Sequence, residues 1–108
     1  MSVMNMNHEQ FNNIVLNGSE PVLVEFWAPW CVYCRRIAPM YDKVAQQYEG
    51  RLIVAKVNID EEPELARRER IEVIPTLVLY QNGEALGSLV APDSKGRIEE
   101  LISQSLGI

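Results

Sequence analysis

Cysteine and histidine are scarce in this chain, and its basic side chains are too few to balance the acidic ones. The 108 residues include two cysteines, one histidine, 10 lysines and arginines, and 15 aspartates and glutamates, which gives a net charge of −5. A tetrahedral zinc site needs about four nitrogen or sulfur ligands, and His8 lies in a different segment from the two cysteines. We therefore expect no metal and no other cofactor. The negative charge argues against a nucleic acid or an anionic membrane as a partner.

Long apolar runs are also missing, and none approaches the length of a membrane span. Residues 1–5 have neither a basic segment nor an apolar segment of the kind that directs export. A chain with only two cysteines and without such a signal is typical of a reducing compartment, so we expect the cytoplasm. The length suffices for one hydrophobic core but not for two, which predicts a single domain over residues 1–108, and we expect a monomer.

What the chain does have is a cysteine pair in an informative place. Cys31 and Cys34 stand after a strand-like run and at the beginning of a helix-like one. Neighbours at this spacing can open and close a disulfide, and a helix N-terminus stabilises a thiolate. A purely structural bridge would close too small a loop to restrict the unfolded chain, and two inert thiols are the remaining alternative. The placement favours redox chemistry.

Within the pair, the position at the helix N-terminus makes Cys31 the better nucleophile. The N–H groups of Tyr33 and Cys34 would point at its sulfur. Cys34 lies a turn further in, should be more buried, and would resolve a mixed disulfide formed at Cys31. Arg35 and Arg36 would also favour a thiolate, but arginine stems reach outward and we expect both side chains to point to solvent.

Periodicity and turn residues predict the order of the elements. Asn7 and Gln10 form a capping box, and Asn82-Gly83 is a strong hairpin turn. The predicted strands are 3–4, 22–27, 52–59, 75–80 and 85–90. The predicted helices begin at 7, at 31, at 60, and at 93 or 94. Helices between the strands at 22–27, 52–59 and 75–80 predict parallel crossovers, and the hairpin predicts one antiparallel pair. The fold class is therefore α/β, with a central mixed sheet flanked by helices on both faces.

Glu25 is a charged residue in the middle of an apolar strand, on the face that it shares with Leu23 and Trp27. A buried carboxylate tends to stay protonated or to ionise with a raised pKa. Such a group suits a proton acceptor for Cys34 when that thiol resolves a mixed disulfide. Lys56 is likewise isolated in an apolar run. The alternative is a salt bridge at a strand end, or two side chains that reach out to solvent.

Five segments, in this order and spacing, make the chain resemble the thioredoxin family. They are Phe26–Cys34, Ile37–Pro39, Val54–Asp60, Ile74–Leu77 and Gln81–Gly83. The resemblance implies the thioredoxin fold and a thiol–disulfide oxidoreductase that reduces protein disulfides through Cys31 and Cys34. It also implies a thioredoxin reductase and disulfide-containing targets as partners.

The resemblance further implies roles for individual residues. Lys56 would lie near Glu25 and join it in proton transfer, and the Ile74–Pro75 bond would be cis. An extended target segment would dock on an apolar surface around Cys31, pairing with backbone beside Pro75. The residues expected to bind it are Trp30, Val32, Tyr33, Val73, Ile74, Pro75 and Ala91. Trp27 is expected to pack in the core instead.

Four departures from the family pattern leave alternatives open. Val32-Tyr33 replaces the usual Gly-Pro, Glu25 replaces an aspartate, and Ala91-Pro92 replaces a common glycine. Val73 also stands where a small residue is common. The tyrosine N–H, which proline would lack, predicts a more oxidising protein. The alternatives are an oxidase, an isomerase, a glutaredoxin-like user of glutathione, and a non-catalytic binding module with the same fold.

Overall fold

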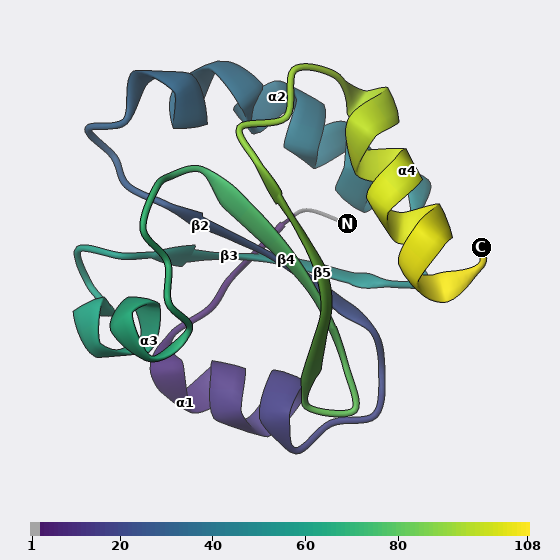
Figure 1. The fold of residues 1–108 in the computed structure, drawn as a ribbon, viewed down its shortest axis with the longest axis horizontal. Coiled ribbons are helices and arrows are strands. Elements are labelled where there is room, and N and C mark those ends of the chain that lie inside the picture. Colours follow the sequence, from purple (N-terminus) through teal and green to yellow (C-terminus); the bar gives the residue numbers. More distant parts are fainter. Residues whose placement is uncertain (1–2) are drawn as a thin grey trace.

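The computed structural model describes residues 3–108, which form a five-stranded sheet in the order β1-β3-β2-β4-β5 (Figure 1). The strands are β1 (Met4–Asn5), β2 (Val22–Trp27), β3 (Ile53–Asn58), β4 (Thr76–Gln81) and β5 (Glu84–Val90). The helices are α1 (His8–Gln10), which continues as a π-helical segment η1 (Phe11–Leu16), α2 (Val32–Gln47), α3 (Pro63–Arg68) and α4 (Lys95–Leu106). The mixed sheet predicted from the sequence is confirmed.

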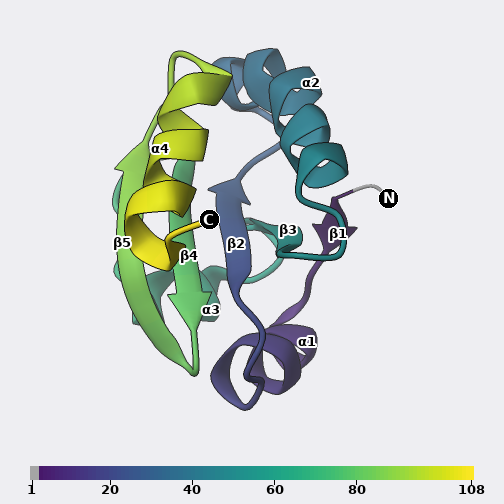
Figure 2. The same cartoon turned by 90° about the vertical axis from the view of Figure 1, so that its right-hand side faces the viewer.

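Helices cover both faces of the sheet, as predicted. In Figures 1 and 2, α2 and α4 lie over one face, and α1 and α3 lie over the other. The alternation along β2 explains the two layers, because its side chains point to opposite faces in turn. Val22, Val24 and Phe26 are buried with the α1 and α3 layer, and Leu23 is buried with the α2 and α4 layer.

Local signals account for most of the helix ends. The capping box at α1 is confirmed by paired hydrogen bonds, because the Gln10 N–H donates to Asn7 at 2.8 Å and the Asn7 N–H donates to Gln10 at 2.9 Å. Ser94 caps α4, and Pro63 occupies the first turn of α3, where its missing N–H costs nothing. Helix α2 ends at Gln47, and Gly50, with φ 86°, follows in the turn beyond it.

The predicted direction of the third main strand is wrong. Strands β2 and β3 are parallel, as expected, but β4 runs antiparallel to β2, with Thr76 opposite Phe26. Helix α3 has six residues, about 9 Å of helix, so it does not span a six-residue strand of about 20 Å. The connection through α3 stays at the edge where β2 and β3 end, and β4 begins there. Residues 28–34, 59–62 and 73–76 meet at this edge.

Among residues 3–108, no helix combines the length and apolarity that crossing a membrane requires.

Candidate active site

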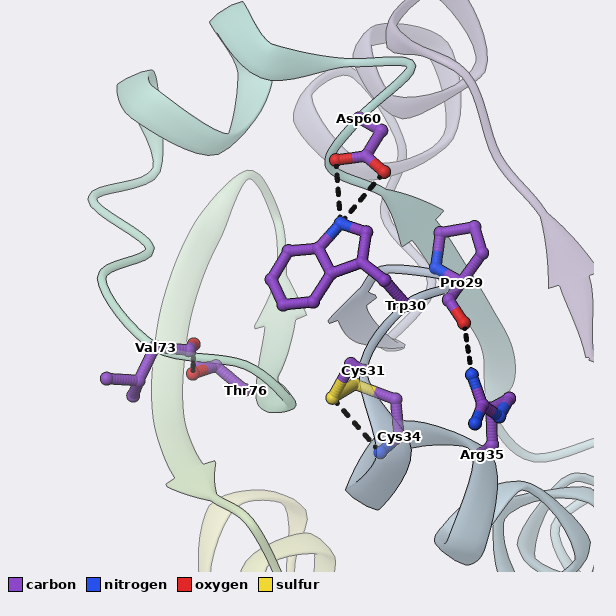
Figure 3. The surroundings of a disulfide bond; sticks show 8 residues. All are labelled: Pro29, Trp30, Cys31, Cys34, Arg35, Asp60, Val73 and Thr76. Atoms are coloured by element: carbon purple, nitrogen blue, oxygen red, sulfur yellow. Dashed lines mark hydrogen bonds between the residues drawn. A yellow bond between two sulfur atoms is a disulfide. The ribbon is translucent and has the colours of Figure 1, made fainter.

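The two cysteines form a disulfide at the N-terminus of α2. Cys31 is the N-cap residue, with extended backbone, and its sulfur accepts a 3.1 Å hydrogen bond from the Cys34 N–H (Figure 3). Cys31 is 8% exposed and Cys34 is 3% exposed, so the prediction that Cys34 is the more buried of the two is confirmed. The predicted second donor, the Tyr33 N–H, makes no bond to this sulfur in the described part of the chain. The hydrogen bond on which the prediction of a more oxidising protein rests is therefore absent from this disulfide form.

Glu25 lies in the middle of β2 and is 3% exposed. Burial raises the pKa of its carboxyl from 4.5 to about 7; the positive charge of Lys56 opposes this shift and the negative charge of Asp42 adds to it. Its Oε2 atom has no hydrogen-bond partner among the described residues. The group is thus a buried carboxyl that changes protonation near neutral pH.

A cavity of about 230 Å³ joins this carboxyl to the redox pair. Glu25 and Cys34 both line it, with Trp27, Arg35, Ala38 and Lys56 as the other walls. The volume has room for ordered water, and a proton can pass between two groups through one water molecule. The arrangement can therefore take a proton from the Cys34 thiol without direct contact between the two side chains.

Lys56 pairs in register with Glu25 across β2 and β3, so the two residues are neighbours as predicted. The ammonium nitrogen, however, lies 4.6 Å from the centre of the Trp27 ring, and no ion pair between Lys56 and Glu25 occurs in residues 3–108. The salt bridge weighed as an alternative is not formed. Trp27 itself is half-buried against the cluster of Ala28 and the two cysteines.

The residues predicted to bind a target surround the disulfide. Trp30, Val32 and Val73 are 63%, 59% and 53% exposed, and exposed apolar side chains that gather in one place mark interaction sites. Tyr33 and Ile74 are half-buried against the cysteines, Pro75 is buried and Ala91 is exposed. The Ile74–Pro75 bond is cis. The Ala91 N–H donates to the Pro75 carbonyl at 2.9 Å, which joins the last two segments.

Several contacts at the site were not predicted. The Trp30 indole donates to the Asp60 carboxylate at 3.0 Å, and Arg35, although exposed, donates to the Pro29 carbonyl at 2.7 Å (Figure 3). The sequence could have indicated Asp60 as a neighbour of Trp30. Trp30 follows β2 and Asp60 follows β3, and the carboxyl ends of these parallel strands meet at one edge of the sheet. Val90, 53% exposed and opposite Thr76, adds to the apolar surface. The sequence did not indicate this residue, because its position beside the site follows from how β5 pairs with β4.

A larger hollow, of about 740 Å³, lies between α1 and α3. His8 and residues of α3 line it, and neither cysteine does, so it is separate from the redox pair. Within residues 3–108, no group of three or more histidine, cysteine, aspartate or glutamate side chains gathers where it could hold a metal ion.

Comparison with known proteins agrees with this geometry. The family model described as Thioredoxin matches residues 2–104. Thioredoxin 1 from Nostoc sp. (strain PCC 7120) is 43% identical over 96 residues, which cover 89% of this chain and 90% of that protein. The thioredoxin of Porphyra purpurea is 36% identical over 104 residues, 96% of this chain and 97% of that protein. A chloroplastic M-type thioredoxin from Spinacia oleracea is 38% identical over 104 residues, 96% of this chain and 58% of that protein.

Proposed function

Because the chain belongs to the thioredoxin family and is a thiol–disulfide oxidoreductase, we propose that Cys31 attacks target disulfides and that Cys34 resolves the mixed disulfide. The observation that carries this assignment is the hydrogen bond from the Cys34 N–H to the Cys31 sulfur at the N-terminus of α2. A donor aimed at one sulfur favours negative charge on that sulfur. Family membership also implies disulfide-containing targets and a thioredoxin reductase.

The reaction proceeds in two exchanges. The Cys31 thiolate attacks one sulfur of the target disulfide, and the other target sulfur leaves as a thiolate and takes up a proton. The Cys34 thiol then loses its proton to Glu25 through water in the shared cavity and attacks the Cys31 sulfur. The second target sulfur leaves as a thiolate and takes up a proton. Two electrons have passed to the target, and Cys31 and Cys34 are oxidised to a disulfide.

Target docking uses the exposed apolar surface around Cys31. The backbone N–H and C=O of Ile74 make no hydrogen bond within residues 3–108, so both are free to pair with an extended segment. Trp30, Val32 and Val73 offer apolar contacts on either side of the disulfide. Burial of such side chains supplies affinity without demanding one target sequence.

A test of docking is Val73→Asp, which places a charge where a target would bury apolar surface. We expect the second-order rate of insulin reduction to fall at least about tenfold, since loss of a valine contact amounts to about 1.5 kcal/mol. Leu86→Asp is the matched control, because Leu86 is also exposed but lies near the other end of β5. Equal rates for the two variants would place the docking surface elsewhere.

Turnover separates this function from the alternatives. We expect insulin reduction when NADPH and a thioredoxin reductase supply electrons, and at least about tenfold slower reduction when glutathione supplies them. Faster reduction with glutathione would favour a glutaredoxin-like protein. A non-catalytic binding module would give the same result for the native protein and for Cys34→Ala, namely no reduction in either assay.

The remaining parts of the proposal concern where and in what state the protein works. We place it in the cytoplasm, since a dithiol reductant is kept reduced there, and we propose that it acts as a monomer because the exposed apolar surface is assigned to targets. Cell fractionation and light scattering test these statements. A dimer that buries Val73 would contradict the second.

A further inference from the structure

The side chain of Tyr33 connects the redox pair to a distant loop. Its ring packs against the cluster of Ala28 and the two cysteines, and its hydroxyl donates a 2.9 Å hydrogen bond to the Pro92 carbonyl, 59 positions away. Pro92 is buried in the loop between β5 and α4, which passes beside α2 in Figures 1 and 2. A tyrosine between the cysteines therefore reaches the loop that carries Ala91.

This loop has an unfavourable backbone conformation. Ala91 has φ 45°, in the left-handed region that disfavours any residue with a Cβ atom. Two hydrogen bonds flank it: the Ala91 N–H donates to the Pro75 carbonyl at 2.9 Å, and the Pro92 carbonyl accepts from Tyr33. Loss of either anchor would let the alanine relax out of the left-handed region.

We propose that Tyr33 is a positioning residue whose hydroxyl holds the Ala91–Pro92 loop in the shape that receives target proteins. The inference rests on the docking surface proposed above, of which Ala91 forms one side. A loop that is already ordered loses less conformational freedom when a target binds, so affinity is higher. The hydroxyl acts through the loop and leaves the sulfur chemistry to Cys31 and Cys34.

The test is Tyr33→Phe, which keeps the ring against the cysteines and removes only the donor. Single-turnover reduction of insulin by the reduced variant should reach half-saturation at an insulin concentration about fivefold higher than for the native protein. The limiting rate at saturating insulin should change by a smaller factor. Fivefold is about 1 kcal/mol at 1.4 kcal/mol per tenfold, the usual size of one hydrogen bond. The ratio of the rate with insulin to that with a small aromatic disulfide, which reacts without reaching the loop, should fall by a similar factor. Tyr48→Phe, which removes a hydroxyl near the other end of α2, should leave this ratio unchanged.

A second substitution tests the route through the loop. Adding Ala91→Gly to Tyr33→Phe should restore at least half of the lost affinity, because glycine adopts φ 45° without a Cβ penalty. Any of three results would overturn the inference. Tyr33→Phe could reach half-saturation at the same insulin concentration as the native protein, it could lose as much rate with the small disulfide as with insulin, or Ala91→Gly could fail to restore affinity. A lowered melting temperature with an unchanged rate ratio would assign the hydroxyl to stability alone. If Val73→Asp still slows insulin reduction in these cases, the docking surface stands and only the role of Tyr33 falls.

Discussion

Cys34→Ser is expected to lose disulfide turnover and to accumulate target proteins joined to Cys31 as mixed disulfides. Once Cys31 has attacked a target, the resolving thiol must come from the same helix turn, and Cys34, with its Cα 5.2 Å from that of Cys31, supplies it. A serine hydroxyl does not displace a thiolate from a disulfide, so the mixed disulfide between Cys31 and the target persists. Intact-mass analysis after incubation with a disulfide-containing protein, with and without dithiothreitol, measures the trapped species.

The matched control is Cys31→Ser, which should neither turn over nor trap. Both variants lose only a bridge that closes a very small loop, so their stabilities should stay close to that of the reduced protein. Trapping by Cys31→Ser but not by Cys34→Ser would reverse the assignment of nucleophile and resolving thiol.

The parts of the fold and site that the sequence predicts are those with local signals. The capping box at Asn7 and the hairpin at Asn82-Gly83 each lie within a few residues, and both appear where expected. Burial of Glu25 followed from the alternation along one strand, because its neighbours on both faces are apolar. The position of the cysteines at a helix N-terminus was also predicted from local pattern, because they stand between a strand-like run and a helix-like run.

The parts that the sequence does not predict depend on where distant segments meet. The direction of β4 depends on where the connection through α3 leads the chain, and no pattern within β4 records it. The hydrogen bond from Tyr33 to Pro92 joins positions 59 apart and leaves no periodic pattern. The contact of Lys56 with the Trp27 ring, in place of an ion pair with Glu25, likewise depends on side-chain geometry within the folded sheet.

Glu25→Gln should change the pH dependence of stability in the oxidised protein. The free energy of unfolding of the variant, relative to that of the native protein, should be higher at alkaline pH than at acidic pH. Burial raises the pKa of Glu25 from 4.5 to about 7, so between these values the folded protein binds more protons than the unfolded chain. The free energy of unfolding of the native protein therefore falls as pH rises through this window, and the loss is complete above it. At 1.36 kcal/mol per pKa unit the loss is about 3 kcal/mol, of which about 2 to 3 kcal/mol falls between pH 5 and pH 8.

The glutamine amide stays neutral, so this pH-dependent loss should be absent from the variant. Any cost of placing the amide beside Trp27 and Lys56 is the same at every pH and cancels when the two pH values are compared. Denaturant unfolding of both proteins at pH 5 and pH 8 measures the difference, and Glu84→Gln, a change at an exposed carboxylate, is the control. Parallel stability curves for the native protein and Glu25→Gln would mean that Glu25 does not carry the raised pKa.

The same substitution should slow the second exchange. If Glu25 accepts the proton of Cys34 through water in the shared cavity, then Glu25→Gln removes the acceptor and leaves Cys31 able to attack. Mixed disulfides should then persist longer at neutral pH, with a slowing of about 10²-fold or more, the usual contribution of a general base. The native rate of resolution should rise with pH through about 7, where Glu25 ionises, and the variant should lack this rise. Quenched-flow trapping between pH 6 and pH 9 measures both rates, and identical profiles would assign Glu25 to structure alone.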